Sequence, residues 1–163
     1  MSEPQLDHSI DISMRTATTD DLEDVARLYI ELKQHHRALA PHAERYQVAD
    51  EEWQRLAGRW LANPHMATVL AEVDGEVVGF VRFSFVEKPW GLACEVATLV
   101  VAEAWRGRGI GKQLMIESER IAARQGARGM RVDVLIENEG GRLFYGREGY
   151  GAFAVRYGKP VGD

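Results

Sequence analysis

The first part of the chain shows the spacing of amphipathic helices behind one short strand. Residues 10–16 alternate weakly between polar and apolar positions, which predicts a first strand. Thr18 and Asp21 have the spacing of a capping box, and the apolar residues behind them recur at helical spacing until Pro41. Asp50 is predicted to cap a second helix. We therefore expect a strand and two helices before the next change of pattern.

From residue 68 the pattern changes to runs typical of strands. Residues 68–73 and 76–86 flank Asp74-Gly75, a dipeptide typical of a two-residue hairpin turn, and residues 93–101 form an apolar run expected of a central strand. The remaining predicted elements are a helix over 109–125, a strand over 130–136, a short helix over 140–148 and a last strand over 150–157. This order predicts an α/β chain of the α+β type, with a mixed sheet flanked by helices.

Length and composition indicate one globular domain over residues 1–163, of which residues 1–9 are expected to be a flexible leader. The net charge of −5 argues against a nucleic-acid partner, and no apolar run approaches the ~20 residues that span a bilayer. The lone cysteine, Cys94, cannot form an internal disulfide, which is compatible with a reducing compartment. We therefore expect a cytoplasmic protein with neither a nucleic-acid nor a membrane partner.

A basic, glycine-rich segment, called here the glycine turn, follows the apolar run. Its residues are Arg106, Gly107, Arg108, Gly109, Ile110, Gly111 and Lys112. Glycines let the backbone approach a bulky anion, and a helix N-terminus offers free N–H groups, so the turn predicts a phosphate or pyrophosphate site. It does not match G-x-G-x-x-G, whose last glycine position holds Lys112 or Leu114, nor a P-loop, whose last position holds Gln113. A turn that merely begins a helix is the alternative.

Two motifs resemble those of the GNAT superfamily of N-acetyltransferases. The first is a strand ending in Leu-x-Val, here Leu99-Val100-Val101, followed by [RQ]-x-x-G-x-[GA] in the glycine turn. The second is N-x-x-A-x-x-x-Y-x-x-x-G-[FY], here Asn138, Gly141, Tyr145, Gly149 and Tyr150, with glycine in place of the usual alanine. The order of the elements also matches over roughly residues 10–157.

The resemblance implies a mixed, mostly antiparallel central sheet that is splayed between its fourth and fifth strands. It implies acetyl-CoA as the cofactor, with its pantetheine arm in the opening and paired with the main chain of Leu99, Val100 and Val101. The pyrophosphate would lie on N–H groups of residues 106–112, and Asn138 would touch the pantetheine arm. Family members are often dimers, so the resemblance leaves a homodimer open.

Acetyl transfer to an amine needs a base, because an alkylamine with a pKa near ~10 is mostly protonated at neutral pH. Glu95 is the candidate. It lies four residues before Leu99 on one predicted strand, so both side chains are expected on the same face. A carboxylate in an apolar strand is costly unless it has a task or a partner, and the resemblance implies a catalytic glutamate at this offset in some members. A structural ion pair with an arginine is the alternative.

The resemblance also implies an oxyanion donor and a general acid. The main-chain N–H of Leu99 matches the family's donor to the oxyanion. Tyr145 is the candidate acid, because a phenol beside a leaving thiol with a pKa near ~8.5 can supply its proton. Packing of Tyr145 among the bulky residues of an amphipathic helix is the alternative.

The cysteine and the histidines give weaker signals. Cys94 alternates to the face opposite Glu95 and has no nearby histidine in the sequence, so core packing is predicted. His35 and His36 lack the carboxylate or cysteine frame of a metal site, so no metal is predicted. They are expected either to line the acceptor pocket or to lie at a solvated helix end.

Three functions are consistent with these residues. The first is an N-acetyltransferase that moves the acetyl group of acetyl-CoA to a primary amine of a small molecule or peptide by direct attack, with Glu95 as base and Tyr145 as acid. The second is a non-catalytic acyl-CoA-binding or sensing module, and the third is a nucleotide-binding regulator. The amine itself stays open, although the negative net charge mildly favours cationic acceptors through long-range attraction.

Overall fold

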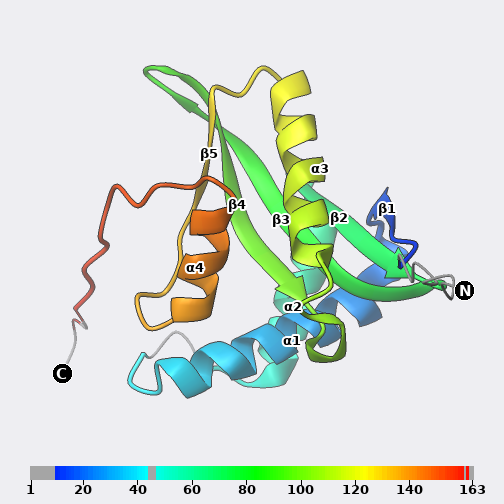
Figure 1. Cartoon of the computed structure of the whole chain (residues 1–163). Helices are drawn as coiled ribbons and strands as arrows, with labels where there is room; N and C mark the ends of the chain where they lie inside the picture. Colours follow the sequence, from blue (N-terminus) through cyan, green and yellow to red (C-terminus); the bar gives the residue numbers. More distant parts are fainter. Residues whose placement is uncertain (1–9, 44–46, 160, 162–163) are drawn as a thin grey trace, which may run out of the picture. The chain divides into compact units, whose positions relative to one another are not determined.

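The structure is a computed structural model that describes residues 10–43, 47–159 and 161 (Figure 1). Its contacts divide the chain into two compact units, residues 1–133 and residues 134–163, each of which is described by itself. The predicted leader, residues 1–9, lies outside the described residues. The organisation of the chain as a single domain remains a prediction.

The first unit is built on a five-stranded sheet whose strands lie in chain order (Figure 1). The strands are β1 (Ser13–Thr16), β2 (Met66–Val73), β3 (Glu76–Lys88), β4 (Gly91–Val101) and β5 (Gly129–Val132). The strands from β1 to β4 pair antiparallel, and β5 pairs parallel with β4. The prediction of a mixed, mostly antiparallel sheet is confirmed.

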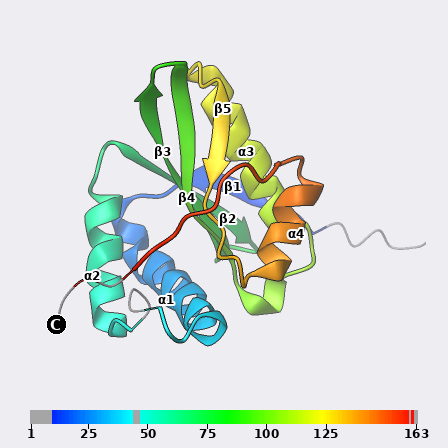
Figure 2. The same ribbon diagram turned by 90° about the vertical axis from the view of Figure 1, so that its left-hand side faces the viewer.

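Helices cover both faces of this sheet (Figures 1 and 2). The helices α1 (Leu22–Leu39) and α2 (Asp50–Leu61) share a core with buried residues of the sheet, among them Phe80 and Val100. The helix α3 (Ile110–Arg124) lies on the other face, where a Cβ atom at Gly79 would meet Leu114 Cδ1 at 3.3 Å. Gly79 and Phe80 are neighbours on β3, so they point to opposite faces. The sheet is therefore flanked by helices, as predicted.

Two local signals in the sequence act as expected. The Asp21 carboxylate accepts a hydrogen bond from the Thr18 N–H at 2.8 Å, and the Thr18 side chain caps the short 3-10 turn (Thr19–Asp21) that leads into α1. Asp74 and Gly75 have φ angles of 51° and 79°, the left-handed conformation that a tight hairpin turn between β2 and β3 requires. The capping box and the hairpin are both confirmed.

The prediction that Asp50 caps α2 is wrong. Asp50 is the first residue of the helix, and Ala49 holds the N-cap position without a side-chain hydrogen bond. The Asp50 carboxylate instead accepts a hydrogen bond from Gln34 Nε2 at 3.3 Å and lies 3.8 Å from Arg37 Nη2. Both partners belong to α1, so this carboxylate links the two helices rather than capping one of them.

Two predicted strand ends and one predicted strand are also wrong. β1 begins at Ser13 rather than at residue 10, and β5 ends at Val132 rather than at residue 136. The last predicted strand, residues 150–157, does not form: the described residues 150–159 adopt no regular element, and those from 151 onward are exposed. A strand needs a partner for its N–H and C=O groups, and an alternating pattern alone does not supply one.

The second unit contains the helix α4 (Glu139–Arg147). Asn138 caps this helix, because its Oδ1 atom accepts a hydrogen bond from the Gly141 N–H at 2.9 Å. The ring of Tyr145 makes edge-to-face contacts with Phe144 and Tyr150, with centroids 5.1 Å and 5.5 Å apart. The predicted short helix is confirmed.

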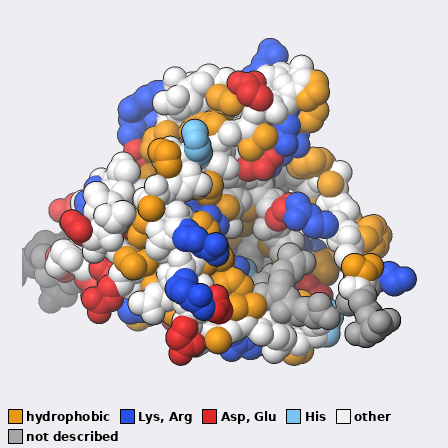
Figure 3. All heavy atoms as spheres, turned by 180° about the vertical axis from the view of Figure 1, so that it is seen from behind, with side chains coloured by type: hydrophobic (Ala, Val, Ile, Leu, Met, Phe, Trp, Pro, Cys, Tyr) orange, Lys and Arg blue, Asp and Glu red, His pale blue; other side chains and the backbone are white. Residues whose placement is uncertain are grey.

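Charged side chains of both signs are interspersed on the face shown in Figure 3. This distribution agrees with the modest net charge of −5, since neither sign gathers into one continuous field on that face. In the part of the chain that the structure describes, no helix combines the length and the apolar character needed to cross a bilayer.

Candidate functional site

The strands β4 and β5 separate along part of their length. Their parallel ladder consists of four pairs, from Ala93 with Gly129 to Val96 with Val132. β4 continues to Val101, so its outer edge beyond Val96 has no partner in β5. The predicted splay between the fourth and fifth strands is therefore present.

Main-chain groups of Leu99 and Val101 point to this open edge. The Ala102 N–H donates to the Val78 carbonyl oxygen of β3 at 2.8 Å. Because main-chain groups alternate in direction along a strand, those of Val100 also face β3, whereas those of Leu99 and Val101 face away from it. A side-chain contact agrees: Arg106 Nε donates to the Val101 carbonyl oxygen at 3.0 Å. The Leu99 N–H thus lies where the predicted pantetheine arm would be.

A β-bulge separates Glu95 from Leu99. Phe83 of β3 lies opposite Val96, but the preceding Arg82 lies opposite Thr98, which leaves one extra residue on β4. Directly opposed residues share a face of the sheet, so Leu99 points with its partner Val81, and Glu95 points with its partner Ser84.

Val81 and Ser84 are three residues apart on β3, so they point to opposite faces. The predicted common face for the Glu95 and Leu99 side chains is therefore wrong, because the bulge reverses the alternation between them. The main-chain N–H of Leu99 is unaffected, since it lies in the plane of the sheet.

Glu95 is a partly exposed carboxylate in an ion pair. Its Oε1 atom lies 2.9 Å from Lys88 Nζ, and the Glu95 side chain is 41% exposed. The predicted alternative, a structural ion pair, is therefore present, with a lysine rather than an arginine as the partner. Glu95 lies on the face of α1 and α2, because Ser84 and Phe80 have the same parity on β3 and Phe80 packs in the core beneath these helices.

The glycine turn leaves the N-terminus of α3 open. Gly107 and Gly109 have φ angles of 74° and 80°, which other residues adopt at a cost. Gly109 is the N-cap of α3 and offers no capping side chain, and the first turn of the helix contains no acidic residue. The Ile110 side chain is buried and anchors the turn in the core, while Arg108 and Lys112 are exposed beside it. Such an end attracts anions.

Asn138 and Tyr145 belong to the second unit. The Asn138 side chain is engaged as the cap of α4. A Cβ atom at Gly141 would lie 2.6 Å from Asn138 Nδ2, so the glycine that replaces the usual alanine of the motif leaves room for this cap. Burial raises the pKa of Tyr145, so its phenol keeps its proton at neutral pH.

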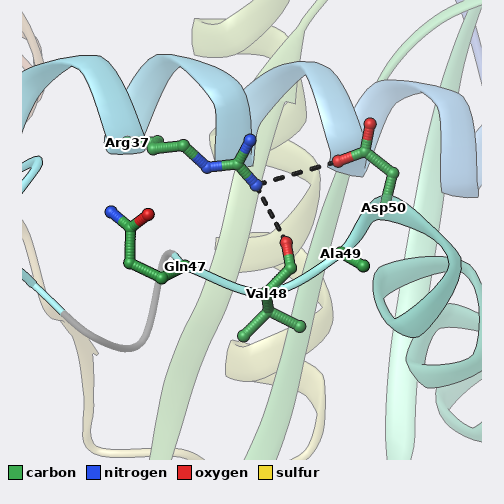
Figure 4. A pocket seen from close by; sticks show the side chains of 5 residues that line it. All are labelled: Arg37, Gln47, Val48, Ala49 and Asp50. Carbon is green, nitrogen blue, oxygen red and sulfur yellow. Dashed lines mark hydrogen bonds and ion pairs between the residues drawn. The ribbon is translucent and has the colours of Figure 1, made fainter.

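An open surface hollow of about 400 Å³ lies between the last turn of α1 and the start of α2 (Figure 4). It is lined by Arg37, Gln47, Val48, Ala49 and Asp50. Arg37 Nη2 donates to the Val48 carbonyl oxygen at 2.9 Å and so crosses the hollow. Neither His35 nor His36 lines it; their rings lie 6.1 Å apart on α1. The two expectations for these histidines both remain open.

Cys94 packs in the core, as predicted. Its side chain is fully buried, and burial raises the pKa of its thiol to about 11, so it is a poor nucleophile at neutral pH. Within the described residues, no group of three or more His, Cys, Asp or Glu side chains is arranged to hold a metal ion.

Two residues near β4 and the glycine turn, Glu31 and Arg82, were not predicted from the sequence. Glu31 of α1 accepts hydrogen bonds from the Glu103 N–H and from Arg106 Nη2. Arg82 is a buried cation in the middle of β3. Arg82 could have been found from the sequence, because it is a charged residue within an apolar strand, which is the same feature that makes Glu95 a candidate.

Comparison with known sequences places the chain in a family. The family described as "Acetyltransferase (GNAT) family" matches residues 22–150. An uncharacterized N-acetyltransferase of Methanocaldococcus jannaschii is 31% identical over 144 residues, which make up 85% of this chain and 60% of that protein. An aminoalkylphosphonate N-acetyltransferase of Salmonella typhimurium is 29% identical over 155 residues, 91% of this chain and 90% of that protein. The chain thus spans less than two thirds of the archaeal relative and most of the bacterial one.

Solved structures show the same fold. A possible acetyltransferase from Clostridium difficile 630 superposes with a TM-score of 0.75 at 20% identity, over 93% of this chain and 99% of that chain. The aminoglycoside N-acetyltransferase AAC(6')-Iy in complex with CoA superposes with a TM-score of 0.71 at 20% identity, over 96% of this chain and 99% of that chain. The fold, the motifs and the family match agree, and the chain belongs to the GNAT family of acetyltransferases.

Proposed function

We propose that this protein transfers the acetyl group of acetyl-CoA to a primary amine of a small molecule. The observation that carries the proposal is the open edge of β4 beside the uncapped N-terminus of α3. Family membership supports the reaction class. The Salmonella relative is named for a small amine, the aminoalkylphosphonates, and this supports a small-molecule acceptor over a peptide.

The first unit offers groups that suit two parts of acetyl-CoA. The main-chain groups of Leu99 at the open edge suit an amide-bearing arm that lies along β4 as an added strand does. The N–H groups at the start of α3, with the exposed Arg108 and Lys112, suit a diphosphate. When bound, acetyl-CoA supplies an activated acetyl thioester.

Glu95 is the proposed base. The amine nitrogen must lose a proton as its bond to the acetyl carbon forms, and a carboxylate can take that proton directly or through one water. Lys88 lies at the Oε1 atom of Glu95, which leaves Oε2 for the amine. The partial exposure of the side chain lets an acceptor reach it from solvent.

Tyr145 as general acid and the Leu99 N–H as oxyanion donor are proposed on the motif match. A phenol with a raised pKa keeps its proton but is a weaker acid. We therefore expect Tyr145 to act mainly by donating a hydrogen bond to the departing sulfur, with proton transfer as the smaller part of its contribution.

Two measurements test this function. Calorimetric titration should show binding of acetyl-CoA and none of ATP or NAD, which a nucleotide-binding regulator would prefer. Release of free CoA thiol over a panel of amines then tests transfer, and Cys94, the only cysteine, is buried and adds little background. Binding without turnover on any amine would favour the acyl-CoA-binding module, and absence of binding would exclude both.

A further inference from the structure

Arg82 holds a positive charge in the interior of the first unit. Only 9% of its surface is exposed. Its guanidinium stacks on the ring of Trp60 from α2, with Cζ 3.6 Å from the ring centroid. Its Nη2 atom donates to Thr98 Oγ1 at 3.3 Å. An aromatic face and one long hydrogen bond to a neutral hydroxyl replace little of the hydration that a buried cation loses.

The charge of Arg82 has no acidic partner among the described residues. No carboxylate there lies within ion-pair distance of it, and its buried Nε atom has no hydrogen-bond partner. Burial lowers the pKa of Arg82 to about 10, so it is still charged at neutral pH. A guanidinium has five N–H donors in a planar fork that matches two oxygens of a carboxylate or phosphonate. Most of this donor capacity is unused among the residues that the structure describes.

Arg82 shares a face of the sheet with the proposed base. Arg82 and Ser84 are two residues apart on β3, so their side chains point the same way, and Ser84 lies directly opposite Glu95. Two residues along a strand span ~7 Å. Exposure falls along this face from the Glu95 side chain, at 41%, to Arg82, at 9%. Glu95 and Arg82 therefore lie on one face of the sheet, within the length of a short molecule.

We propose that Arg82 binds an acidic group of the acceptor, so that the acceptor is a short amine carrying a carboxylate or a phosphonate. The inference rests on the proposed function, since it assigns the acceptor of the same site. The amine lies at Glu95, and the acidic group takes the free donors of Arg82. The negative net charge of the protein attracts cationic acceptors only at long range, and salt screens this attraction within about 8–10 Å. Direct contact with the buried charge of Arg82 is not screened in this way, so it outweighs the long-range attraction and favours an acidic acceptor.

Acceptor selectivity of the unmodified protein tests the inference directly. The probes are 3-aminopropionate and 2-aminoethylphosphonate, matched against propylamine and 1,3-diaminopropane, each with acetyl-CoA at saturation. We expect kcat/KM to be at least about tenfold higher for the acidic amines, mainly through KM. The ratio between the two acidic probes shows whether carboxylate or phosphonate is preferred.

Two failures can be told apart in this comparison. Equal or better use of the neutral or cationic amine would overturn the inference and leave acetyl transfer standing. No turnover of any amine, together with no binding of acetyl-CoA, would overturn the proposed function as well.

Substitution of Arg82 separates binding from structure. Arg82→Met should raise KM for the acidic amines roughly 10- to 100-fold and change KM for propylamine much less, with Arg82→Lys intermediate. Arg59→Met, which removes an exposed arginine of α2, is the matched control and should change KM neither for the acidic amines nor for propylamine. The melting temperature of Arg82→Met should not fall, because an apolar side chain removes the cost of an unpaired buried charge. A lower melting temperature with the same loss for every amine would show that Arg82 is structural and overturn the proposal.

Discussion

Arg106 Nε donates a hydrogen bond to the Val101 carbonyl oxygen at 3.0 Å and so ties the glycine turn to the open edge of β4. The same guanidinium lies 3.3 Å from Glu31 Oε1 on α1. The Glu31 carboxylate also accepts from the Glu103 N–H at 2.9 Å, just beyond the end of the strand. Arg106 therefore connects the edge of β4, the glycine turn and the helix α1.

Loss of this connection should weaken acetyl-CoA binding. We expect Arg106→Met to raise Kd roughly tenfold in calorimetry, because the turn loses its attachment and one positive charge. Arg106→Gln, which the motif permits, should lose less affinity for acetyl-CoA, because the glutamine amide can still donate a hydrogen bond to the Val101 carbonyl oxygen. Arg59→Met removes an equal charge from the surface of α2 and should leave Kd unchanged. Equal affinity in all three variants would mean that Arg106 has no part in the site.

Two glycines at opposite ends of α3 form a matched pair for testing the turn. Gly109 and Gly126 have φ angles of 80° and 78°, and an added Cβ would meet nothing within 4 Å at either position. Alanine at each site should therefore cost about the same in unfolding free energy, roughly 1 kcal/mol, from backbone strain alone. Only Gly109→Ala should weaken acetyl-CoA binding. If both variants weakened it equally, the effect would be one of stability rather than of the anion site.

Glu95→Gln should reduce kcat by roughly 10²- to 10³-fold while acetyl-CoA binding persists, because an amide cannot accept the proton of the amine. Lys88→Met serves as the control, since it removes the same ion pair but keeps the carboxylate. Because both side chains of the pair are partly exposed, neither change should alter stability by more than about 1 kcal/mol. Equal losses of activity in the two variants would show that the ion pair, and not the base, is what matters.

Tyr145→Phe should lower kcat by about tenfold or more with little change in acetyl-CoA affinity, because the ring stays and only the donor is lost. Tyr150→Phe is the matched control: its ring lies 5.5 Å from that of Tyr145, and the motif permits phenylalanine there. The measurement is the turnover of both variants, and a loss in Tyr145→Phe alone would support a catalytic role for the Tyr145 hydroxyl. Unchanged turnover of Tyr145→Phe would leave packing within its unit as the role of this side chain.

Acid should destabilise the junction between β1 and α1. A hydrogen bond from Arg15, the largest cause, lowers the pKa of Asp21 from 3.8 to about 2. Because the folded pKa lies below the unfolded one, the stabilisation is complete above about pH 5 and is lost as the pH falls toward 2. We expect about 1–2 kcal/mol, allowing for solvent screening, since the Arg15 side chain is 41% exposed.

The measurement is urea unfolding between pH 6 and pH 2.5, compared with Asp21→Asn. The variant should lose stability at pH 6 and show a shallower decline below pH 4. Parallel declines in both proteins would mean that this carboxylate does not contribute to acid unfolding.

Local features of the fold were predictable from the sequence because each depends on a few adjacent residues. The hairpin at Asp74-Gly75 follows from backbone conformations that these residues tolerate. The cap formed by Thr18 and Asp21 follows from side chains that reach nearby N–H groups. The alternating pattern of residues 150–157 predicted a strand wrongly, because pairing depends on a partner elsewhere in the chain.

The sequence by itself determined the class of the fold, the glycine turn and the two motifs that identify the family, since spacing and residue type carry these. Only the tertiary structure decided which side chains share a face and which charges lack an acidic partner among the described residues. The extra residue on β4 reverses alternation between Glu95 and Leu99, and packing under α2 isolates Arg82. Both depend on the register of one strand against another and on helices that are distant in the chain, so neither can be derived from local spacing.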